Sequence, residues 1–479
     1  MNSISIEKVT INGLFGKKDI SLDFLSGVRI IVGENGLGKT TILNILNELF
    51  KGNPENIIDY PLDSVNIKVE SLSDEFIFSR EEMRRFREME KRVLEDLEKP
   101  GVDKLLDKLM DTIDNRLWLS DRAQLESLLK TIIKDYPDLR AGLSPFVTMP
   151  EKIIADWISE FPLVFFFKKI IKEQAMDVCF LPTYRRIETD VTKVVDSRNT
   201  VFIPNRRGGI GIDRISASAS EILQQVFSDS SLMKFGMKDV SRSINGILDK
   251  ISSKAVKGYN EVSTKMVTHL LDFGEKRRAA IEKKIDADQL RVVLERLGGS
   301  ISEREREQLR DVIKNGGAES NEHLNYYLSA LLDVYKSTEE LDSVLNSFCR
   351  IVNEFLYDKQ FVYDESHIKF NLYFKDDSTL SSPVSLENLS SGEKQLVALF
   401  TFAFFSNNKR IVYIIDEPEL SLSLTWQRLL LPSLKNVPTT ALIVVATHSP
   451  FIFDNELKYD TIGSAEYVHE IPNNTYRHG

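Results

Sequence analysis

Residues 33–41 have the spacing of a phosphate-binding loop: a glycine, four residues, and then Gly-Lys-Thr-Thr. The glycines let backbone N–H groups turn towards phosphate oxygens, and the helix that follows directs its positive end at them. We expect Lys39 to contact the β- and γ-phosphates and the Thr40 hydroxyl to bind Mg²⁺. The predicted ATP-binding residues are Gly33, Glu34, Asn35, Gly36, Leu37, Gly38, Lys39, Thr40 and Thr41.

Residues 410–418 deliver two carboxylates at the end of an apolar run, Arg-Ile-Val-Tyr-Ile-Ile followed by Asp-Glu-Pro. Ligands of parallel sheets bind at the carboxyl ends of the strands, which is where Asp416 and Glu417 would lie. We expect Asp416 to hold Mg²⁺ through water and Glu417 to be the general base that activates the attacking water. An Asp at a strand end is weak evidence alone, but together with a phosphate-binding loop it is typical of an ATPase.

Two further segments point to the same kind of site. Residues 389–395, Leu-Ser-Ser-Gly-Glu-Lys-Gln, open a predicted helix, where Ser390 is either an ordinary N-cap or a phosphate contact. Residues 446–450, Ala-Thr-His-Ser-Pro, end a predicted strand and place His448 at its carboxyl end. A lone histidine is most often structural, but His448 resembles the switch histidine of ABC ATPases, which senses the γ-phosphate.

The four segments, in this order along the chain, resemble the motifs of the ABC ATPase superfamily. Residues 389–393 resemble its signature, Leu-Ser-Gly-Gly-Gln, with Ser391 in place of the first glycine and Glu393 in place of the glutamine. The resemblance implies ATP hydrolysis with Mg²⁺ at a site shared by two copies, each lending its signature to the other. It also implies catalytic roles for Glu417 and His448. The predicted signature residues, acting in trans, are Ser390, Ser391, Gly392 and Glu393.

Three other sets of residues have weaker claims on the site. Two arginines occupy the place of the family's Q-loop, but their segment contains no glutamine, so a surface turn is an equal alternative. An aromatic residue and two lysines after the first strand are candidate adenine contacts, and a DxD pair in a charged helix is typical of a solvated face. These residues are, in turn, Arg185 and Arg186; Phe15, Lys17 and Lys18; and Asp286 and Asp288.

Strands and one amphipathic helix surround the phosphate-binding loop. Residues 28–32 are a continuous β-branched run, typical of a strand buried on both faces, and residues 40–50 carry apolar side chains at helical spacing. Strand patterns recur towards both ends of the chain, and charged helical sequence lies between them. Further strands are expected at residues 3–11, 19–25, 65–70, 75–79, 177–181, 361–374, 411–415 and 441–446, a loop at 205–211, and helices at 274–298 and 396–405.

The fold class that follows is α/β: an ABC-type P-loop ATPase head assembled from both chain ends, with a large and mainly helical insertion. The helix expected at residues 274–298 would be roughly 35 Å long at 1.5 Å per residue, which predicts a short arm. The expected parts are an N-terminal lobe with the P-loop, 1–80; a helical insertion, 81–175; a return to the head, 176–215; a helical arm, 216–358; and a C-terminal lobe, 359–479.

Composition narrows the class of protein. The chain has 479 residues, 42% apolar and 28% charged, and its net charge of −10 does not favour nucleic acid as a partner. The two cysteines, Cys179 and Cys349, lack the spacing of metal ligands. We expect no signal peptide and no membrane partner, because the N-terminus lacks a basic and apolar leader and residues 161–171, the longest apolar run, are too few. The expected compartment is the reducing cytoplasm.

Within the superfamily, the compact arm, the Asp-Glu-Pro-Glu-Leu of residues 416–420 and the segment around His448 resemble the OLD-like (overcoming lysogenization defect) branch. That branch supplies ATPase subunits to bacterial antiphage systems. Size and a single ATPase head favour the PARIS ATPase subunit, with a Septu-type subunit second. Many relatives continue Glu-Leu-His-Leu-His where residues 419–423 read Glu-Leu-Ser-Leu-Ser, so a role of those histidines does not carry over.

The resemblance also implies partners. It implies a homodimer formed through shared ATP sites, or a higher homo-oligomer, and a phage-encoded trigger protein. Residues 449–479 contain no Toprim ligands, so we expect a separate nuclease effector, of the Toprim type. The alternative function is that of a DNA-repair or recombination ATPase of the RecF/Rad50 type, which binds DNA. The short predicted arm, the missing CxxC hook and the negative net charge favour the defence role.

Overall fold

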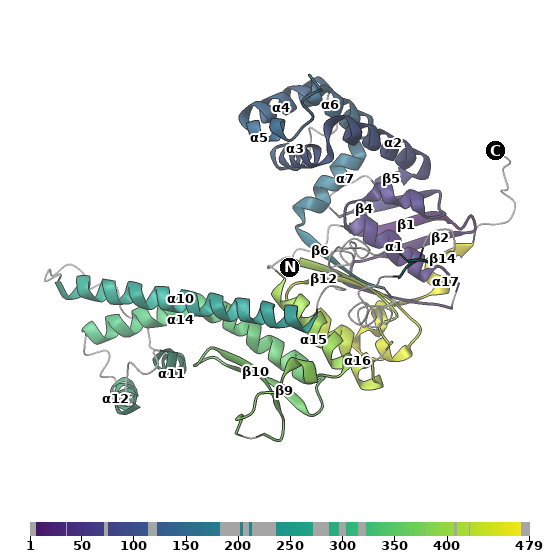
Figure 1. The fold of residues 1–479 in the computed structure, drawn as a ribbon. Helices are drawn as coiled ribbons and strands as arrows, with labels where there is room; N and C mark the ends of the chain where they lie inside the picture. Colours follow the sequence, from purple (N-terminus) through teal and green to yellow (C-terminus); the bar gives the residue numbers. More distant parts are fainter. Residues whose placement is uncertain are drawn as a thin grey trace. The chain divides into compact units, whose positions relative to one another are not determined.

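The computed structural model describes most of the chain, and Figure 1 shows its course from the N-terminus in purple to the C-terminus in yellow. The elements fall into two compact units: residues 1–231 together with 408–479, and residues 232–407. The first unit therefore combines the two ends of the sequence. The predicted domain boundaries stay predictions. The described residues are 6–34, 36–70, 75–113, 122–182, 202–204, 210–212, 236–271, 287–296, 303–314, 322–377, 379–406, 410–420 and 422–470.

A parallel five-stranded sheet forms the centre of the first unit. Its strands, in sheet order, are β13 (Thr461–Gly463), β3 (Val28–Val32), β12 (Thr440–Thr447), β11 (Arg410–Asp416) and β6 (Met176–Leu181). Strands β3, β12 and β11 are buried along most of their length, which explains their continuous apolar runs. In the register, Thr447 lies opposite Val32 and Ala446 opposite Asp416. The carboxyl ends of these three strands therefore share one edge.

An antiparallel sheet belongs to the same unit. Its strands, in sheet order, are β14 (Val468–Glu470), β2 (Lys18–Asp23), β1 (Ile6–Leu14), β4 (Ser64–Val69) and β5 (Glu75–Ser79). Strands β4 and β5 bury every second residue, which indicates one covered face. Helix α1 (Lys39–Phe50) contributes Ile42, Leu43 and Leu46 to a core shared with both sheets. The strand and the helix predicted on either side of the phosphate-binding loop are confirmed.

A helical insertion separates β5 from β6. Its helices are α2 (Arg80–Leu97), α3 (Lys99–Thr112), α4 (Arg122–Asp135), α5 (Pro137–Ala141), α6 (Pro150–Glu160) and α7 (Pro162–Glu173). Helix α2 begins directly after β5 because the Ser79 hydroxyl accepts a hydrogen bond from the backbone N–H of Glu82 at 3.2 Å. The rings of Phe86, Trp157 and Phe165 then pack together across α2, α6 and α7.

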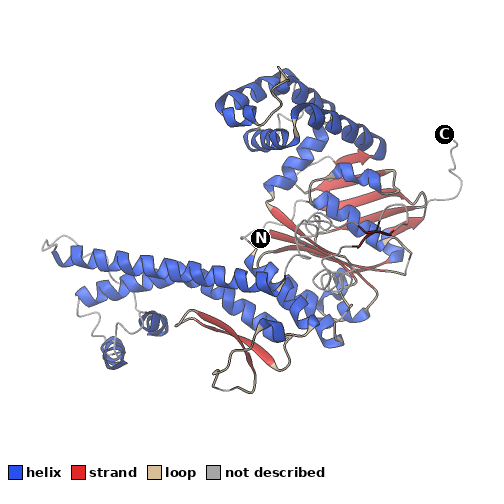
Figure 2. Cartoon of the chain, in the orientation of Figure 1, coloured by secondary structure: helices blue, strands red, loops and turns tan. Residues whose placement is uncertain are grey.

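Two long helices, α10 (Met237–Leu271) and α14 (Glu322–Asn353), form the arm of the second unit and lie side by side, as Figures 1 and 2 show. They run antiparallel, since Lys254 contacts Ser337 and Gly258 lies against Val334. With 35 and 32 residues, each is about 50 Å long. They approach closely at Gly258, where a Cβ atom would lie 2.6 Å from Val334 Cγ1. The arm is therefore longer than the roughly 35 Å expected from residues 274–298. Within that stretch, the structure describes only α11 (Ala287–Arg296), and the other residues of the predicted helix lie outside the described part of the chain.

The base of the arm carries a helix and a hairpin. Helix α15 (Ser391–Phe405) packs against α10 and α14, with Phe405 stacked on Phe348 at 5.2 Å between ring centroids. The hairpin consists of β9 (Lys359–Asp364) and β10 (Lys369–Phe374), so the strand pattern expected at residues 361–374 belongs to two strands joined by a turn. A short 3₁₀ helix (Leu386–Asn388) precedes α15 along the chain, and α12 (Glu303–Lys314) follows α11.

The remaining elements of the first unit are short, apart from one helix. They are β7 (Phe202–Pro204), β8 (Ile210–Ile212), α16 (Leu424–Lys435) and α17 (Ser464–Tyr467), with 3₁₀ helices at Pro54–Asp59, Pro450–Ile452 and Glu456–Asp460. The loop predicted at residues 205–211 is wrong at its end, because Ile210 and Gly211 pair with β7. Among the described residues, no helix has both the length and the apolar character needed to cross a membrane.

Candidate functional site

The candidate site lies at the carboxyl edge of the parallel sheet. Strand β3 leads into the phosphate-binding loop, β11 ends at Asp416, and β12 ends at Thr447, directly before His448. Because the three strands are parallel neighbours, segments from both ends of the chain meet at this edge. The phosphate-binding loop, Asp416 and His448 therefore lie at the carboxyl ends of parallel strands, as the sequence predicted.

The loop between β3 and α1 depends on its glycines. Gly36 and Gly38 have φ angles of +83° and +88°, which glycine adopts without strain. A Cβ atom on Gly33 would lie 2.7 Å from Leu37 Cδ1 and 3.0 Å from the Tyr467 hydroxyl. Helix α1 has no side-chain cap and no acidic residue in its first turn, so its N–H groups and positive dipole end are available to an anion.

Lys39 is buried at the start of α1 with three polar partners. Its Nζ donates to the carbonyl oxygens of Gly33 at 2.7 Å and Glu34 at 3.0 Å, and lies 2.8 Å from His448 Nε2. Burial lowers the pKa of Lys39, while the negative charges of Asp416, Glu417 and Glu419 act to raise it. The predicted lysine and the predicted histidine are thus in direct contact, although 409 residues separate them.

Thr40 and Asp416 form the second pair of predicted residues that the structure brings together. The Thr40 hydroxyl donates to Asp416 Oδ2 at 2.7 Å. Asp416 is 2% exposed, whereas Thr40 is exposed to solvent. A hydroxyl and a carboxylate oxygen in contact are the hard donors that Mg²⁺ prefers, so the donor set fits the predicted metal.

Glu417 follows the strand in a conformation that is uncommon for its residue type. Its φ angle is +49°, in the left-handed region, and its N–H donates to the carbonyl oxygen of Ala446 at 2.8 Å. Such a conformation costs on the order of 1–3 kcal/mol and persists only where the surroundings impose it, most often at functional sites. The strand pairing with β12 therefore fixes the backbone of the predicted general base.

Glu419 is a site residue that the sequence reasoning missed. Its carboxylate accepts hydrogen bonds from the Thr447 hydroxyl at 2.7 Å and from the backbone N–H of His448 at 2.8 Å. Gln427 extends this network, because its Oε1 accepts from the Ser449 hydroxyl at 2.6 Å. The available signal was the second glutamate of Asp-Glu-Pro-Glu, which lies two residues after the predicted base.

The predicted signature residues belong to the second compact unit. Ser390 is the N-cap of α15: its hydroxyl accepts from the N–H of Glu393 at 3.3 Å, and its own N–H donates to Glu393 Oε2 at 2.6 Å. This reciprocal pair is a capping box. Ser390 and Ser391 are exposed, whereas Gly392 and Glu393 are buried. The N-cap reading is confirmed, and the Ser390 hydroxyl keeps its proton available to a second partner.

The weaker candidates have mixed outcomes. The Phe15 ring lies beside the phosphate-binding loop, 2.9 Å from the place of a Cβ on Gly38, and is 46% exposed. Lys17 is exposed in the turn after it, and Lys18 begins β2. Several predicted residues lie outside the described part of the chain or have side chains outside it. These are Asn35, Arg185, Arg186, Asp286 and Asp288.

One protein family matches part of the chain. The family described as AAA domain, putative AbiEii toxin, Type IV TA system matches residues 248–454, which extend from the arm through the signature to His448. No curated protein matches the chain.

Two solved structures of Smc head domains are also similar. One, from Pyrococcus furiosus, has an extended coiled coil bound to the C-terminal domain of ScpA; it is 12% identical, with 97% of this chain and 95% of that chain covered and a TM-score of 0.29. The other, from Pyrococcus yayanosii, has a coiled coil and joint; it is 13% identical, with 97% and 96% covered and a TM-score of 0.28. These TM-scores are too low to assign a function.

The fold class rests on the geometry and on the family match together. A P-loop between a buried strand and a helix, and a pair of carboxylates at the end of another parallel strand of the same sheet, are the parts of a P-loop ATPase. The family that matches residues 248–454 is described as an AAA domain. The predicted fold class is confirmed: the chain has an α/β, ABC-type P-loop ATPase head built from both chain ends, with a large helical insertion.

Proposed function

We propose that this protein binds ATP with Mg²⁺ at the carboxyl edge of its parallel sheet and hydrolyses the γ-phosphate. The observation that carries the proposal is the meeting of Lys39 with His448, and of Thr40 with Asp416, at 2.8 and 2.7 Å. Lysine, threonine and aspartate in these places are the side chains that phosphate and Mg²⁺ require. The uncapped N-terminus of α1 supplies the backbone N–H groups for the phosphates.

Each residue has a task that its position supports. When bound, Mg²⁺ would neutralise charge on the phosphate oxygens next to Thr40 and Asp416. Lys39 Nζ exchanges its carbonyl partners at Gly33 and Glu34 for phosphate oxygens and keeps a point charge there. The Glu417 carboxylate accepts a proton from the attacking water. His448 Nε2 accepts a hydrogen bond from Lys39, so a change in the position or charge of the lysine reaches the histidine ring.

The site is proposed to be completed by a second copy. Ser390 is exposed at the N-terminus of α15, where its hydroxyl proton and the helix dipole favour a phosphate of the partner copy. Ser391, Gly392 and Glu393 share this first turn. The active form would thus be a homodimer with two shared sites, or a higher homo-oligomer.

The experiment that tests hydrolysis is steady-state phosphate release by the purified full chain with Mg²⁺-ATP. Lys39→Ala removes the ammonium that faces the phosphates, and we expect it to abolish nucleotide binding measured by calorimetry. The charge is worth several orders of magnitude in rate. Wild-type ATP affinity in Lys39→Ala would rule out the P-loop assignment, and no phosphate release by the wild type would rule out the ATPase.

The cellular role we propose is that of an ATP-dependent sensor and scaffold in an antiphage defence system of the OLD-like kind, nearest to PARIS. It would hold a separate Toprim-type nuclease until a phage-encoded trigger protein is sensed. The matched family is described as a putative AbiEii toxin of a Type IV TA system, and this description agrees with a role in defence. Co-purification of a nuclease encoded beside this chain, lost on expression of a trigger, would test the role.

DNA repair or recombination is the second candidate function. The observation that favours it is the length of α10 and α14. Each helix is about 50 Å long, so the short predicted arm no longer argues against a DNA-binding ATPase. The net charge of −10 argues against it. Stimulation of phosphate release by linear duplex DNA at physiological salt would favour the repair role over the defence role.

A further inference from the structure

The signature of this chain carries a buried carboxylate where the family pattern has a neutral amide. Glu393 is 6% exposed, and both of its carboxylate oxygens are engaged. Oε2 accepts from the backbone N–H of Ser390 at 2.6 Å, and Oε1 lies 3.4 Å from Lys359 Nζ. A buried carboxylate is costly unless a cation and hydrogen bonds compensate for it, and here Lys359 supplies the cation.

Lys359 is held in place by more than Glu393. Its side chain is 11% exposed, its Nζ lies 2.9 Å from Asp358 Oδ1, and it stands 6.0 Å above the centre of the Phe374 ring. Asp358 first, and Glu393 as well, raise the pKa of Lys359, so the ammonium form is favoured. The lysine is therefore a fixed positive charge between two carboxylates at the first residue of β9.

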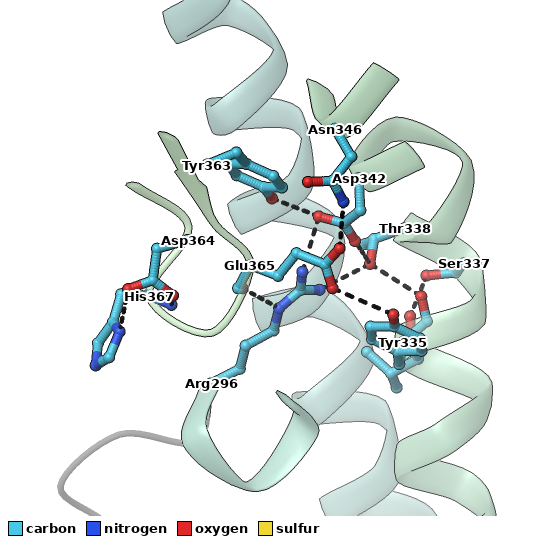
Figure 3. Close-up of polar contacts among 11 residues, drawn as sticks. Arg296, Tyr335, Ser337, Thr338, Asp342, Asn346, Tyr363, Asp364, Glu365 and His367 are labelled. Atoms are coloured by element: carbon cyan, nitrogen blue, oxygen red, sulfur yellow. Dashed lines mark hydrogen bonds and ion pairs between the residues drawn. The ribbon is translucent and has the colours of Figure 1, made fainter. Parts of the chain in front are cut away.

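The hairpin that carries Lys359 is anchored at both ends. Near the lysine, the Asn353 side chain exchanges hydrogen bonds with the backbone of Phe361, at 2.7 and 2.9 Å. At the turn, Tyr363 and Glu365 join a polar cluster with Arg296, as Figure 3 shows. Because the hairpin backbone is anchored at both ends, Lys359 can hold the Glu393 carboxylate in one geometry.

We propose that Lys359 is a positioning residue of the ATPase, which neutralises Glu393 and thereby holds Ser390 ready for the phosphate of the partner copy. The inference rests on the ATPase function proposed above. Without Lys359, the buried carboxylate of Glu393 would lose its cation and keep only the Ser390 N–H and the helix dipole, at a helix start that must receive a triphosphate. With it, the capping box of Ser390 and Glu393 stays closed, and a glutamate serves where related signatures use glutamine.

The test separates charge compensation from mere packing. We expect Lys359→Met to lower kcat on the order of tenfold, because it leaves a buried carboxylate unpaired. ATP binding to Lys39 and its loop, measured by calorimetry, should be unchanged. Lys359→Arg should retain most of the turnover. Glu393→Gln, in which glutamine also closes a capping box but carries no charge, should restore most of the turnover when combined with Lys359→Met.

Lys369→Met is the matched control, since it removes an exposed lysine from the other strand of the same hairpin. Wild-type kcat in Lys359→Met, or no rescue of it by Glu393→Gln, would overturn the proposal. A second readout is amide hydrogen exchange of residues 385–397, which we expect to be faster in Lys359→Met than in Lys369→Met. If the wild type releases no phosphate, the ATPase proposal fails, and the exchange measurement still decides: equal exchange in the two variants overturns the role of Lys359.

Discussion

His448 shows how one residue is fixed from two directions. Its backbone N–H donates to Glu419, and its ring accepts from Lys39, so the side chain lies between the turn after β11 and the start of α1. A shift of the Lys39 side chain therefore acts directly on the His448 ring, and a shift of Glu419 in the turn acts on His448 through its backbone N–H. These contacts give a physical basis for a histidine that reports on the phosphate.

Glu417→Gln is the sharpest test of the chemistry at this scale. The amide keeps the shape of the side chain but cannot take a proton from water, so we expect ATP to bind normally and turnover to fall by on the order of a hundredfold or more. Bound ATP should then accumulate in a dimer, visible by mass measurement of the intact complex. If turnover matches that of the wild type, Glu417 is not the base.

Glu419 should matter through the backbone it holds. In Glu419→Ala, the Thr447 hydroxyl and the His448 N–H lose their acceptor, and we expect kcat to fall by about tenfold, or ~1.4 kcal/mol, with nucleotide affinity retained. Glu419→Gln keeps one acceptor oxygen and should lie between alanine and wild type. Turnover and calorimetric affinity, measured side by side, check this order, and an unaffected kcat in the alanine variant would contradict it.

At the scale of elements, a buried ion pair joins α11 to α14, and hydrogen bonds connect this pair to the hairpin. Arg296 at the end of α11 donates to Asp342 of α14 at 2.8 Å, with side chains 1% and 2% exposed. The same guanidinium donates to the Thr338 hydroxyl and to the carbonyl oxygen of Glu365, while Asp342 accepts from Tyr363, as Figure 3 shows. Burial and hydrogen bonding to Asp342 hold the pKa of Tyr363 well above its usual range.

Arg296→Met should therefore destabilise the second unit strongly. It leaves the Asp342 carboxylate buried without a cation, which costs roughly 3–5 kcal/mol. Arg242→Met is the matched control: its partner Asp239 is one turn away on α10, and the Arg242 side chain is 78% exposed, so a cost of about 0–1 kcal/mol is expected. Thermal unfolding of the two variants compares them directly, and equal midpoints would contradict a structural role for the pair.

The sequence predicted the local elements and the motif residues that meet at the sheet edge, but not the supporting contacts of residues outside those motifs. Residues 28–32 and 75–79 are strands with the predicted bounds, because a continuous or alternating apolar pattern determines them locally. The arm helices α10 and α14 lie within residues 216–358, where an arm was expected, but the only arm helix for which bounds were predicted was at residues 274–298. Glu419 and Lys359 act on partners 29 and 34 residues away, and no local pattern reports such pairs.

At the scale of the whole chain, the two halves of the proposed site lie in different compact units. Lys39, Asp416 and His448 belong to the unit made from both chain ends, whereas Ser390 belongs to residues 232–407. A site assembled from two copies would use one unit from each. Mixed dimers can test this sharing, because one variant can lose only the Lys39 half of the site and the other only the Ser390 half.

Mixing Ser390→Arg with Lys39→Ala should regenerate activity that neither variant has alone. The arginine would clash with the opposing phosphate cradle, and the alanine lacks the phosphate-binding charge, but the mixed dimer keeps one intact site. Random pairing puts about half of the dimers in the mixed state, so about a quarter of wild-type phosphate release should return if the two sites act independently. Co-expressed and co-purified variants, with the mixed dimer confirmed by mass, provide the measurement.

Each outcome of the mixing experiment has a distinct physical meaning. A recovery well below a quarter indicates that the two sites are coupled, since one empty P-loop then slows the intact site. No recovery in confirmed mixed dimers means that the sites fire only together or are not shared. Full activity of Ser390→Arg alone would contradict a shared site, because an arginine at the exposed N-cap of α15 leaves no room for the partner's phosphates.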